Sequence, residues 1–244
     1  MTAVFSQSAQ VYDRLCRHKD YAGASATVCA IIDRLTPGAT TLLDAGCGTG
    51  HHLSHLAHRF TAEGLDLSTE MLDVARTRCR GVAFHQRSLV EFDLGKRFDV
   101  VTCLFGSIAY ATDEASLRRA IRSLADHLQP GGLLIVEPWV TPDRFVSGRL
   151  VMDTVDDADL KVARLYVTAR RGNVSIYDST YLVGTADGVA SFTERQELGL
   201  FGDDVYRQAF ADAGREVVDA TGDLFGYGLY VCSIRNGSLS PETY

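Results

Sequence analysis

Three glycines at alternate positions follow an apolar run in the stretch LLDAGCGTG, residues 42–50. Because glycine lacks a Cβ, such a turn lets the backbone pass close to a ligand. A dinucleotide-binding turn has the form G-x-G-x-x-G, and its third glycine lets the helix pack closely on the strand. Here the glycines are Gly46, Gly48 and Gly50, and the third position of that pattern is His51. The spacing therefore disfavours a nicotinamide dinucleotide as the ligand.

A carboxylate follows the next apolar run, because Asp66 lies twenty residues after Gly46. At the C-terminal end of a strand, a carboxylate can accept hydrogen bonds from both hydroxyls of a ribose. An aspartate at such a position is often a helix cap instead, but Ser68 is the better cap candidate here. Together the glycines and Asp66 predict a site for a ligand that contains a ribose.

The pattern G-x-G-x-G after a strand that ends in an acid resembles motif I of the class I S-adenosylmethionine (SAM) methyltransferases. The resemblance implies SAM as cofactor and S-adenosylhomocysteine as product. In the family, the acid at position 44 orients loop amides or faces the amino group of the ligand through water. Position 88 departs from the family, which usually has an aspartate there, and Leu89 is expected to flank the adenine. The cofactor contacts that the resemblance implies are Tyr21, Asp44, Ala45, Gly46, Gly48, Gly50, Asp66, Leu67, Met71, Ser88, Leu89, Cys103, Leu104 and Phe105.

Segments spread over most of the chain resemble one group within that family, the antibiotic-pathway N,N-dimethyltransferases that act on dTDP-linked 3-amino-deoxyhexoses. The segments that carry this resemblance are YDRL, KDY, RFDVVTCLFGSIAY, LQPGGLLIVEPW and YRQAFADAG. The resemblance implies transfer of a methyl group to the amine of a small secondary metabolite. Such an in-line displacement mainly requires that the amine lone pair be held in line with the S–CH₃ bond.

Three side chains are candidates for the catalytic step. The family has a tyrosine in its N-terminal helix near the amine, which Tyr12 matches, and a histidine after the fourth strand, where this chain has Tyr110. A phenol with a pKa near 10 is a poor general base at neutral pH, so we expect both tyrosines to orient the amine. Glu137 is expected at the rim of the crevice, where it can attract a cationic amine or take up its proton. The substrate-binding candidates are Tyr12, Ser107, Tyr110, Trp139, Phe192 and Tyr227.

Two departures bear on the acceptor. The chain has EPWV where the family typically has EPWW, and Gly226-Tyr227-Gly228 where it has GRG. The family's arginine is expected to meet the nucleotide diphosphate, and a tyrosine cannot supply its bidentate cationic fork. If the aromatic candidates converge, the pocket favours a compact heterocyclic amine over a nucleotide-linked aminosugar. Candidates for a compensating charge are Arg164, Arg170, Arg171 and Arg195.

Several alternatives stay open at this point. Both acceptors fit an N-methyltransferase. A small-molecule O-methyltransferase and a non-catalytic SAM-binding regulator are further hypotheses, and binding of NAD(P)H would revive a reductase.

The elements that must position these residues alternate in type. Short apolar runs are separated by segments with helical spacing, which is typical of a parallel sheet covered on both faces. We therefore predict an α/β fold, a Rossmann-like, doubly wound, mostly parallel seven-stranded sheet. Its strands are expected at 41–45, 62–66, 82–85, 98–104, 132–137, 215–220 and 228–234, and helices at 9–15, 21–35, 51–59, 69–79 and 114–128. Pro130-Gly131-Gly132 is expected to close the last of these helices.

Residues 160–200 hold three alternating stretches, KVARLYVTA, NVSIYDSTYLV and SFTERQELGLF, which read as antiparallel strands. We expect one domain, residues 1–244, with helices at about 8–36 as a lid. An antiparallel insertion at about 150–200 would be the substrate platform, and NGSLSPETY at the end a loose tail.

Composition limits the partners. The net charge is −7 with scattered basic residues, so nucleic acid is not expected as a partner. No apolar run approaches the roughly 20 residues of a membrane span, and a cytoplasmic protein with reduced cysteines is expected. His51, His55 and His58 share a helix face but lack further ligands nearby, so no metal site is predicted. A homodimer is possible.

Overall fold

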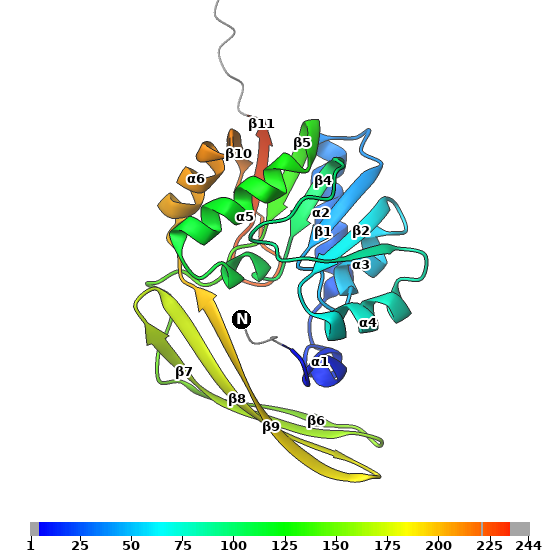
Figure 1. Cartoon of the computed structure of the whole chain (residues 1–244), viewed down its shortest axis with the longest axis vertical. Coiled ribbons are helices and arrows are strands. Elements are labelled where there is room, and N and C mark those ends of the chain that lie inside the picture. Colours follow the sequence, from blue (N-terminus) through cyan, green and yellow to red (C-terminus); the bar gives the residue numbers. More distant parts are fainter. Residues whose placement is uncertain (1–4, 221, 235–244) are drawn as a thin grey trace, which may run out of the picture.

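The computed structural model describes residues 5–220 and 222–234, which form two sheets with helices packed mainly on the larger one (Figure 1). The helices are α1 (Ala9–Leu15), α2 (Tyr21–Leu35), α3 (His51–Leu56), α4 (Thr69–Arg78), the 3₁₀ turn η1 (Ser107–Tyr110), α5 (Glu114–Asp126) and α6 (Asp203–Asp212). The strands are β1 (Thr41–Ala45), β2 (Thr61–Asp66), β3 (Ala83–Gln86), β4 (Phe98–Cys103), β5 (Leu128–Val136), β6 (Leu150–Asp156), β7 (Lys161–Arg171), β8 (Val174–Thr185), β9 (Gly188–Gly199), β10 (Arg215–Asp219) and β11 (Tyr230–Ile234).

The larger sheet has seven strands in the order β10-β11-β5-β4-β1-β2-β3. All neighbours are parallel except β11, which runs antiparallel to both β5 and β10. This confirms the predicted mostly parallel sheet. From β1 the chain proceeds to β2 and β3 on one side and returns to β4 on the other. In such sheets a ligand binds at this switch point, outside the carboxyl ends of the strands.

Both faces of this sheet are covered. In Figure 1, α5 and α6 lie over one face, and α2 and α3 lie over the other. Helix α5 begins where the Asp113 side chain accepts the N–H of Ser116, and it buries Leu117, Ile121 and Leu124 at helical spacing. The two apolar layers fix the sheet, and hence the positions of its strand ends.

Three predicted boundaries that bear on the fold were wrong. Helix α3 ends at Leu56 and α5 at Asp126, so both helices are shorter than the predicted 51–59 and 114–128. Strand β5 starts at Leu128 instead of 132, and Pro130-Gly131-Gly132 lies inside it. The pairing with β4 shifts register at this point and Gly131 has a φ of 81°. The three residues therefore form an irregularity in a strand, which glycine tolerates, and do not end a helix.

The smaller sheet is the insertion, and it has four antiparallel strands in the order β6-β7-β8-β9. Three strands were predicted, so β6 was missed, although the strands span 150–199 as the predicted bounds require. The apolar run LVM is continuous, which gave no alternation to indicate a strand with one exposed face. Its register pairs Leu150 with Val167 and Met152 with Leu165.

The two faces of the insertion differ. One face exposes apolar side chains, among them Leu150 at 70%, Met152 at 63% and Leu182 at 51% exposure. The opposite face packs Val155, Val162 and Tyr181 against α1.

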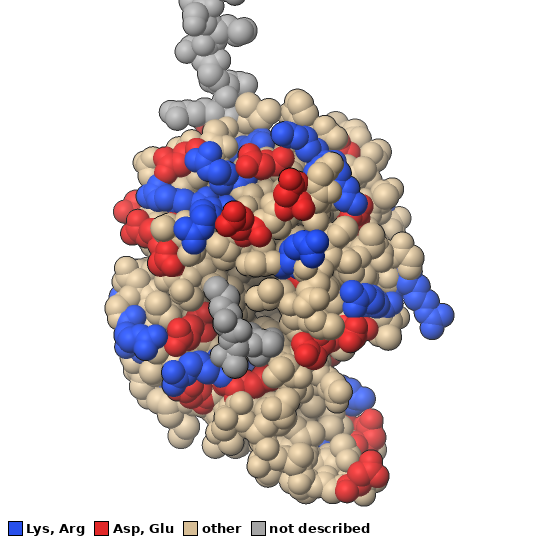
Figure 2. Space-filling view, in the orientation of Figure 1, with Lys and Arg blue, Asp and Glu red and all other residues tan. Residues whose placement is uncertain are grey.

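Charged side chains of both signs are interspersed on the face seen in Figure 2.

None of the helices in the described ranges 5–220 and 222–234 has the length and apolar character needed to span a membrane. All six cysteines are free thiols, with Cys79, Cys103 and Cys232 buried. The predicted tail at 236–244 lies outside the described residues.

Candidate cofactor and acceptor site

The glycine turn leaves β1 at the switch point. Gly46 has a φ of 75°, and a Cβ there would lie 2.6 Å from the Cβ of Ser107. The Ser107 hydroxyl donates to the carbonyl oxygen of Gly46 at 3.1 Å. A Cβ on Gly48, whose φ is 52°, would meet no atom within 4 Å. Gly46 is therefore required by close packing inside the protein, whereas Gly48 borders open space that a ligand can fill.

Asp66 ends β2 and is hydrogen-bonded to this turn. Its Oδ2 accepts the N–H of Gly48 at 2.9 Å, and its Oδ1 accepts the N–H of Ser68 at 2.9 Å. Burial raises the pKa of Asp66 above its ordinary value. Each oxygen keeps a further lone pair, so the carboxylate can still accept from a ribose. Ser68 caps α4 through the N–H of Met71 at 3.1 Å, which confirms the predicted cap.

Asp44 lies beneath the turn, where it is 2% exposed. The hydroxyl of Thr102 donates to its Oδ1 at 2.8 Å. Burial, aided by the negative charge of Asp66, raises the pKa of Asp44 to about 6. Asp44 is thus tied to the neighbouring strand β4 and stands close enough to Asp66 for the two carboxylates to repel each other.

The other predicted cofactor residues surround the same strand ends. Ala45, Cys103 and Leu104 are buried, and their predicted contact with the cofactor stays a prediction. The Leu89 Cδ2 would lie 3.9 Å from a Cβ on Gly46. Three further residues flank β2 and β3, namely Leu67, which is half exposed, Met71, which is buried, and Ser88, whose hydroxyl accepts the N–H of Val90 at 3.3 Å.

Glu137 was predicted at the rim of the crevice, and this was wrong, because its side chain is fully buried. Its Oε2 accepts the N–H of Phe105 at 2.6 Å. Phe105 has a φ of 54°, a left-handed conformation that is uncommon for a residue with a side chain. Burial raises the pKa of Glu137 to about 7, against the lowering effect of that hydrogen bond. The carboxylate therefore holds the backbone that follows β4, and its predicted catalytic role stays a prediction.

An aromatic cluster joins α2 to this backbone. The ring of Tyr21 stacks on His51 with centroids 4.4 Å apart and meets Phe105 and Phe225 edge to face. The Lys19 ammonium lies 5.3 Å and 5.2 Å from the ring centroids of Phe105 and Phe225. Tyr21 thus contacts the segment that follows Gly50, which is compatible with its predicted cofactor role.

A second aromatic cluster follows β5. The rings of Trp139 and Tyr227 are 4.7 Å apart, and Tyr177 lies 6.3 Å from Trp139 and 5.6 Å from Tyr166. The indole also packs on Gly106, where a Cβ would lie 2.7 Å from its Cε3. Trp139 therefore joins the backbone after β4 to the face of the insertion that packs against α1.

The predicted convergence of Tyr110, Trp139, Phe192 and Tyr227 is met only in part. Trp139 and Tyr227 are in contact, but Phe192 stacks on Tyr181 with centroids 4.6 Å apart. Phe192 is held there because it belongs to the apolar cluster that packs on α1.

Tyr12 and Tyr110 come close together around one ring. Phe5 lies 5.5 Å from Tyr12 and 6.3 Å from Tyr110, edge to face in both cases. Burial raises the pKa of both phenols well above the ordinary value, so both are neutral at physiological pH. This state suits the predicted orienting role and excludes a phenolate base near pH 7.

The four arginines proposed as compensating charges already have partners. Arg164 donates to Asp153 through Nε and Nη2. The others are Arg170, bonded to the carbonyl of Pro142, Arg171, paired with Glu197, and Arg195, paired with Asp178.

Arg144, which the sequence analysis did not single out, contacts the loop that contains Gly226-Tyr227-Gly228. The Nη2 of Arg144 donates to the carbonyl oxygen of Gly226 at 3.2 Å. Burial raises the pKa of Tyr227 to about 12, and the positive charge of Arg144 acts in the opposite direction. Arg144 is exposed, so its guanidinium is available to a ligand. Only this long-range contact identifies it, since nothing in the local sequence does.

The chain is similar to known proteins along most of its length. Residues 42–132 match the model of a methyltransferase domain. The dTDP-3-amino-3,6-dideoxy-alpha-D-glucopyranose N,N-dimethyltransferase of Streptomyces fradiae is 38% identical over 91% of this chain and 89% of its own.

Two solved structures are also similar. The sugar N-methyltransferase KedS8 from Streptoalloteichus has 41% identity and a TM-score of 0.84, with 90% of each chain covered. SAM-bound CalS10, an amino pentose methyltransferase from Micromonospora echinaspora, has 38% identity and a TM-score of 0.82, covering 96% of this chain and 100% of its own. The chain therefore belongs to the class I SAM-dependent methyltransferases, in the group of N-methyltransferases that these enzymes represent.

Proposed function

We propose that this enzyme transfers methyl groups from SAM to the amine of a nucleotide-linked aminosugar. The observation that carries the proposal is that the similarity to the dTDP-aminosugar N,N-dimethyltransferase covers the insertion as well as the glycine turn. A similarity confined to the cofactor half would leave the acceptor open. Coverage of 91% of the chain favours the aminosugar over the compact heterocyclic amine that Tyr227 suggested from the sequence.

The residues at the switch point fit SAM. Gly48 borders open space, Asp66 has lone pairs free for a ribose, and Leu67 and Leu89 offer apolar surface for an adenine. When bound there, SAM would supply a sulfonium methyl group that the amine lone pair can attack, with S-adenosylhomocysteine as the leaving group. The proposed task of the protein is to hold the two reactants in line and to exclude water.

The amine end of the acceptor is proposed to meet neutral groups, and its diphosphate end a cation. Tyr12 and Tyr110 orient the amine through their protonated phenols, and Ser107 begins η1, the turn that ends at Tyr110. Trp139 and Tyr227, whose rings are tilted by 39° to each other, supply aromatic surface on which a base or sugar can pack. Arg144 beside Gly226 supplies a guanidinium that can pair with a diphosphate, in place of an arginine at position 227.

We further propose that two copies of the chain associate through the outer face of the insertion. This face exposes Leu150, Met152, Leu165, Val167 and Leu182, which are 42–70% exposed. A second copy brings the same apolar patch, as a twofold interface requires. A cytoplasmic location stays a prediction.

The acceptor is tested with methyl-labelled SAM and two panels, dTDP-linked aminosugars and small cyclic or aromatic amines. The proposal predicts label on the nitrogen of an aminosugar, detected by mass spectrometry. Label on a compact amine alone, or on an oxygen, would contradict it. Binding of SAM without transfer to either panel would favour the regulator hypothesis.

A further inference from the structure

A cluster of charged and polar side chains outside the proposed acceptor site joins α1 to the glycine turn. The Thr49 hydroxyl donates to Oδ1 of Asp13 at 2.7 Å, and the Nε2 of His51 lies 3.2 Å from the same oxygen. Arg78 of α4 donates to Oδ2 of Asp13 and to the carbonyl oxygen of Thr49. One carboxylate on α1 therefore binds the end of the glycine turn, the start of α3 and the end of α4.

This carboxylate stays charged under all physiological conditions. Burial alone would raise the pKa of Asp13, but hydrogen bonds from His51, Thr49 and Arg78 outweigh it and lower the pKa to about 2. The Thr49 side chain is buried, so its hydroxyl is directed at Asp13 with little competition from water.

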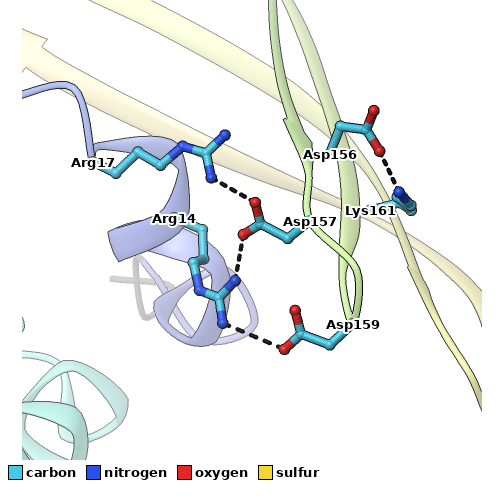
Figure 3. Close-up of polar contacts among 6 residues, drawn as sticks. All are labelled: Arg14, Arg17, Asp156, Asp157, Asp159 and Lys161. Carbon is cyan, nitrogen blue, oxygen red and sulfur yellow. Dashed lines mark hydrogen bonds and ion pairs between the residues drawn. The ribbon is translucent and has the colours of Figure 1, made fainter.

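The opposite side of α1 is attached to the insertion. Figure 3 shows Arg14 and Arg17 converging on Asp157, in the turn between β6 and β7. The Nη1 of Arg17 lies 2.6 Å from Oδ1 of Asp157. Arg14 also reaches Asp159 at 3.4 Å. Just before α1, Glu194 of β9 accepts the N–H of Gln7 at 2.8 Å.

Helix α1 has only seven residues, and a helix of that length is not stable by itself in water. Its position is therefore set by these contacts on its two sides. Tyr12 lies next to Asp13 in the chain, so any change in the docking of α1 also moves the proposed orienting phenol.

We infer that Asp13 is a positioning residue that couples occupancy of the glycine turn to the docking of α1, and so to the orientation of Tyr12. A ligand that orders residues 46–51 fixes Thr49 and His51, which then hold Asp13. The coupling is reciprocal, because an attached α1 must favour the ligand by the same factor. The inference rests on cofactor binding at the glycine turn and not on the identity of the acceptor.

Hydrogen–deuterium exchange of the amides in α1 tests this with S-adenosylhomocysteine as the probe. In the unchanged enzyme the probe should slow exchange over residues 9–15. In Asp13→Asn that slowing should be lost. The affinity for S-adenosylhomocysteine should also fall, by the same factor by which the bound probe favours the docked α1 in the unchanged enzyme. Thr49→Val, which is close to isosteric, should have the same effect if Asp13→Asn does not fold.

Arg17→Gln is the matched control, because it removes a contact of the same helix on the side of the insertion. It should speed exchange of α1 while keeping the slowing by the probe. Equal slowing in Asp13→Asn and the unchanged enzyme would overturn the inference, as would an α1 that does not respond to the probe. Failure of the aminosugar assay alone would overturn the proposed acceptor and leave this coupling standing.

Discussion

Asp66 carries the clearest prediction at the scale of single residues. Asp66→Ala removes the acceptor of the Gly48 and Ser68 N–H groups and the proposed acceptor of the ribose hydroxyls. Hydrogen bonds to a charged group contribute about 1.5–3 kcal/mol, so SAM affinity should fall by about tenfold or more. Calorimetric titration measures this, and an unchanged affinity in the folded variant would contradict the assignment.

Glu137 should make stability depend on pH. Its pKa is about 7 in the folded protein, against an ordinary value of 4.5. The folded state therefore binds more protons between these values, and its stability falls as pH rises through this window. The loss is about 3 kcal/mol for the full shift.

Glu137→Gln keeps an oxygen for the N–H of Phe105 but does not titrate. Urea unfolding at pH 4.5 and 8 should give the variant a smaller loss of stability than the unchanged protein over this range. Parallel pH profiles of the two proteins would show that the carboxyl is not responsible.

Arg144 is predicted to act on substrate binding and not on the chemical step. Arg144→Gln should raise KM for a dTDP-linked aminosugar by about tenfold with little change in kcat, as expected for loss of a charge-assisted contact. Arg195→Gln, at an exposed ion pair with Asp178, is the control and should leave KM unchanged. An equal effect of both substitutions would point to general electrostatics instead of a specific contact.

At the scale of elements, the glycine turn predicts two different substitution effects. In Gly46→Ala the new Cβ would lie 2.6 Å from the Ser107 Cβ at a φ of 75°, so the melting temperature should fall. Gly48→Ala meets no atom within 4 Å and should stay closer to the unchanged protein in stability. It should instead lose SAM affinity, because its methyl group enters the space left for the ligand. Thermal melts and titrations separate the two, and a reversed order of stability would contradict the geometry.

Local patterns predicted the turn and its supports because their partners are near in sequence. The spacing of Gly46, Gly48 and Gly50, the acid at 66 and the cap at Ser68 all concern neighbouring elements. Arg144 and Asp13 could not be predicted, because Gly226 and Arg78 are far away along the chain and only the fold brings them together. Glu137 was misplaced for a related reason, since a residue just after a strand can turn inward as readily as outward.

At the scale of the whole molecule, the outer face of the insertion predicts the oligomeric state. Leu165→Glu and Val167→Glu place charges on a face where both side chains are 42–50% exposed. If two copies pair through this face, the variants should be monomers under conditions in which the unchanged protein is a dimer. Light scattering after size-exclusion chromatography measures the mass, and a dimer that survives both substitutions would exclude this interface.

The two sheets and α1 together form the enzyme, with the proposed cofactor site on the larger sheet and the proposed acceptor site between it and the insertion. The most direct test is the mass of dTDP-3-amino-3,6-dideoxyglucose after incubation with the purified protein and SAM. The proposal predicts that methyl groups appear on the 3-amino nitrogen, together with one S-adenosylhomocysteine for each transfer. An unmethylated aminosugar, across the dTDP-linked panel and with SAM bound, would contradict it.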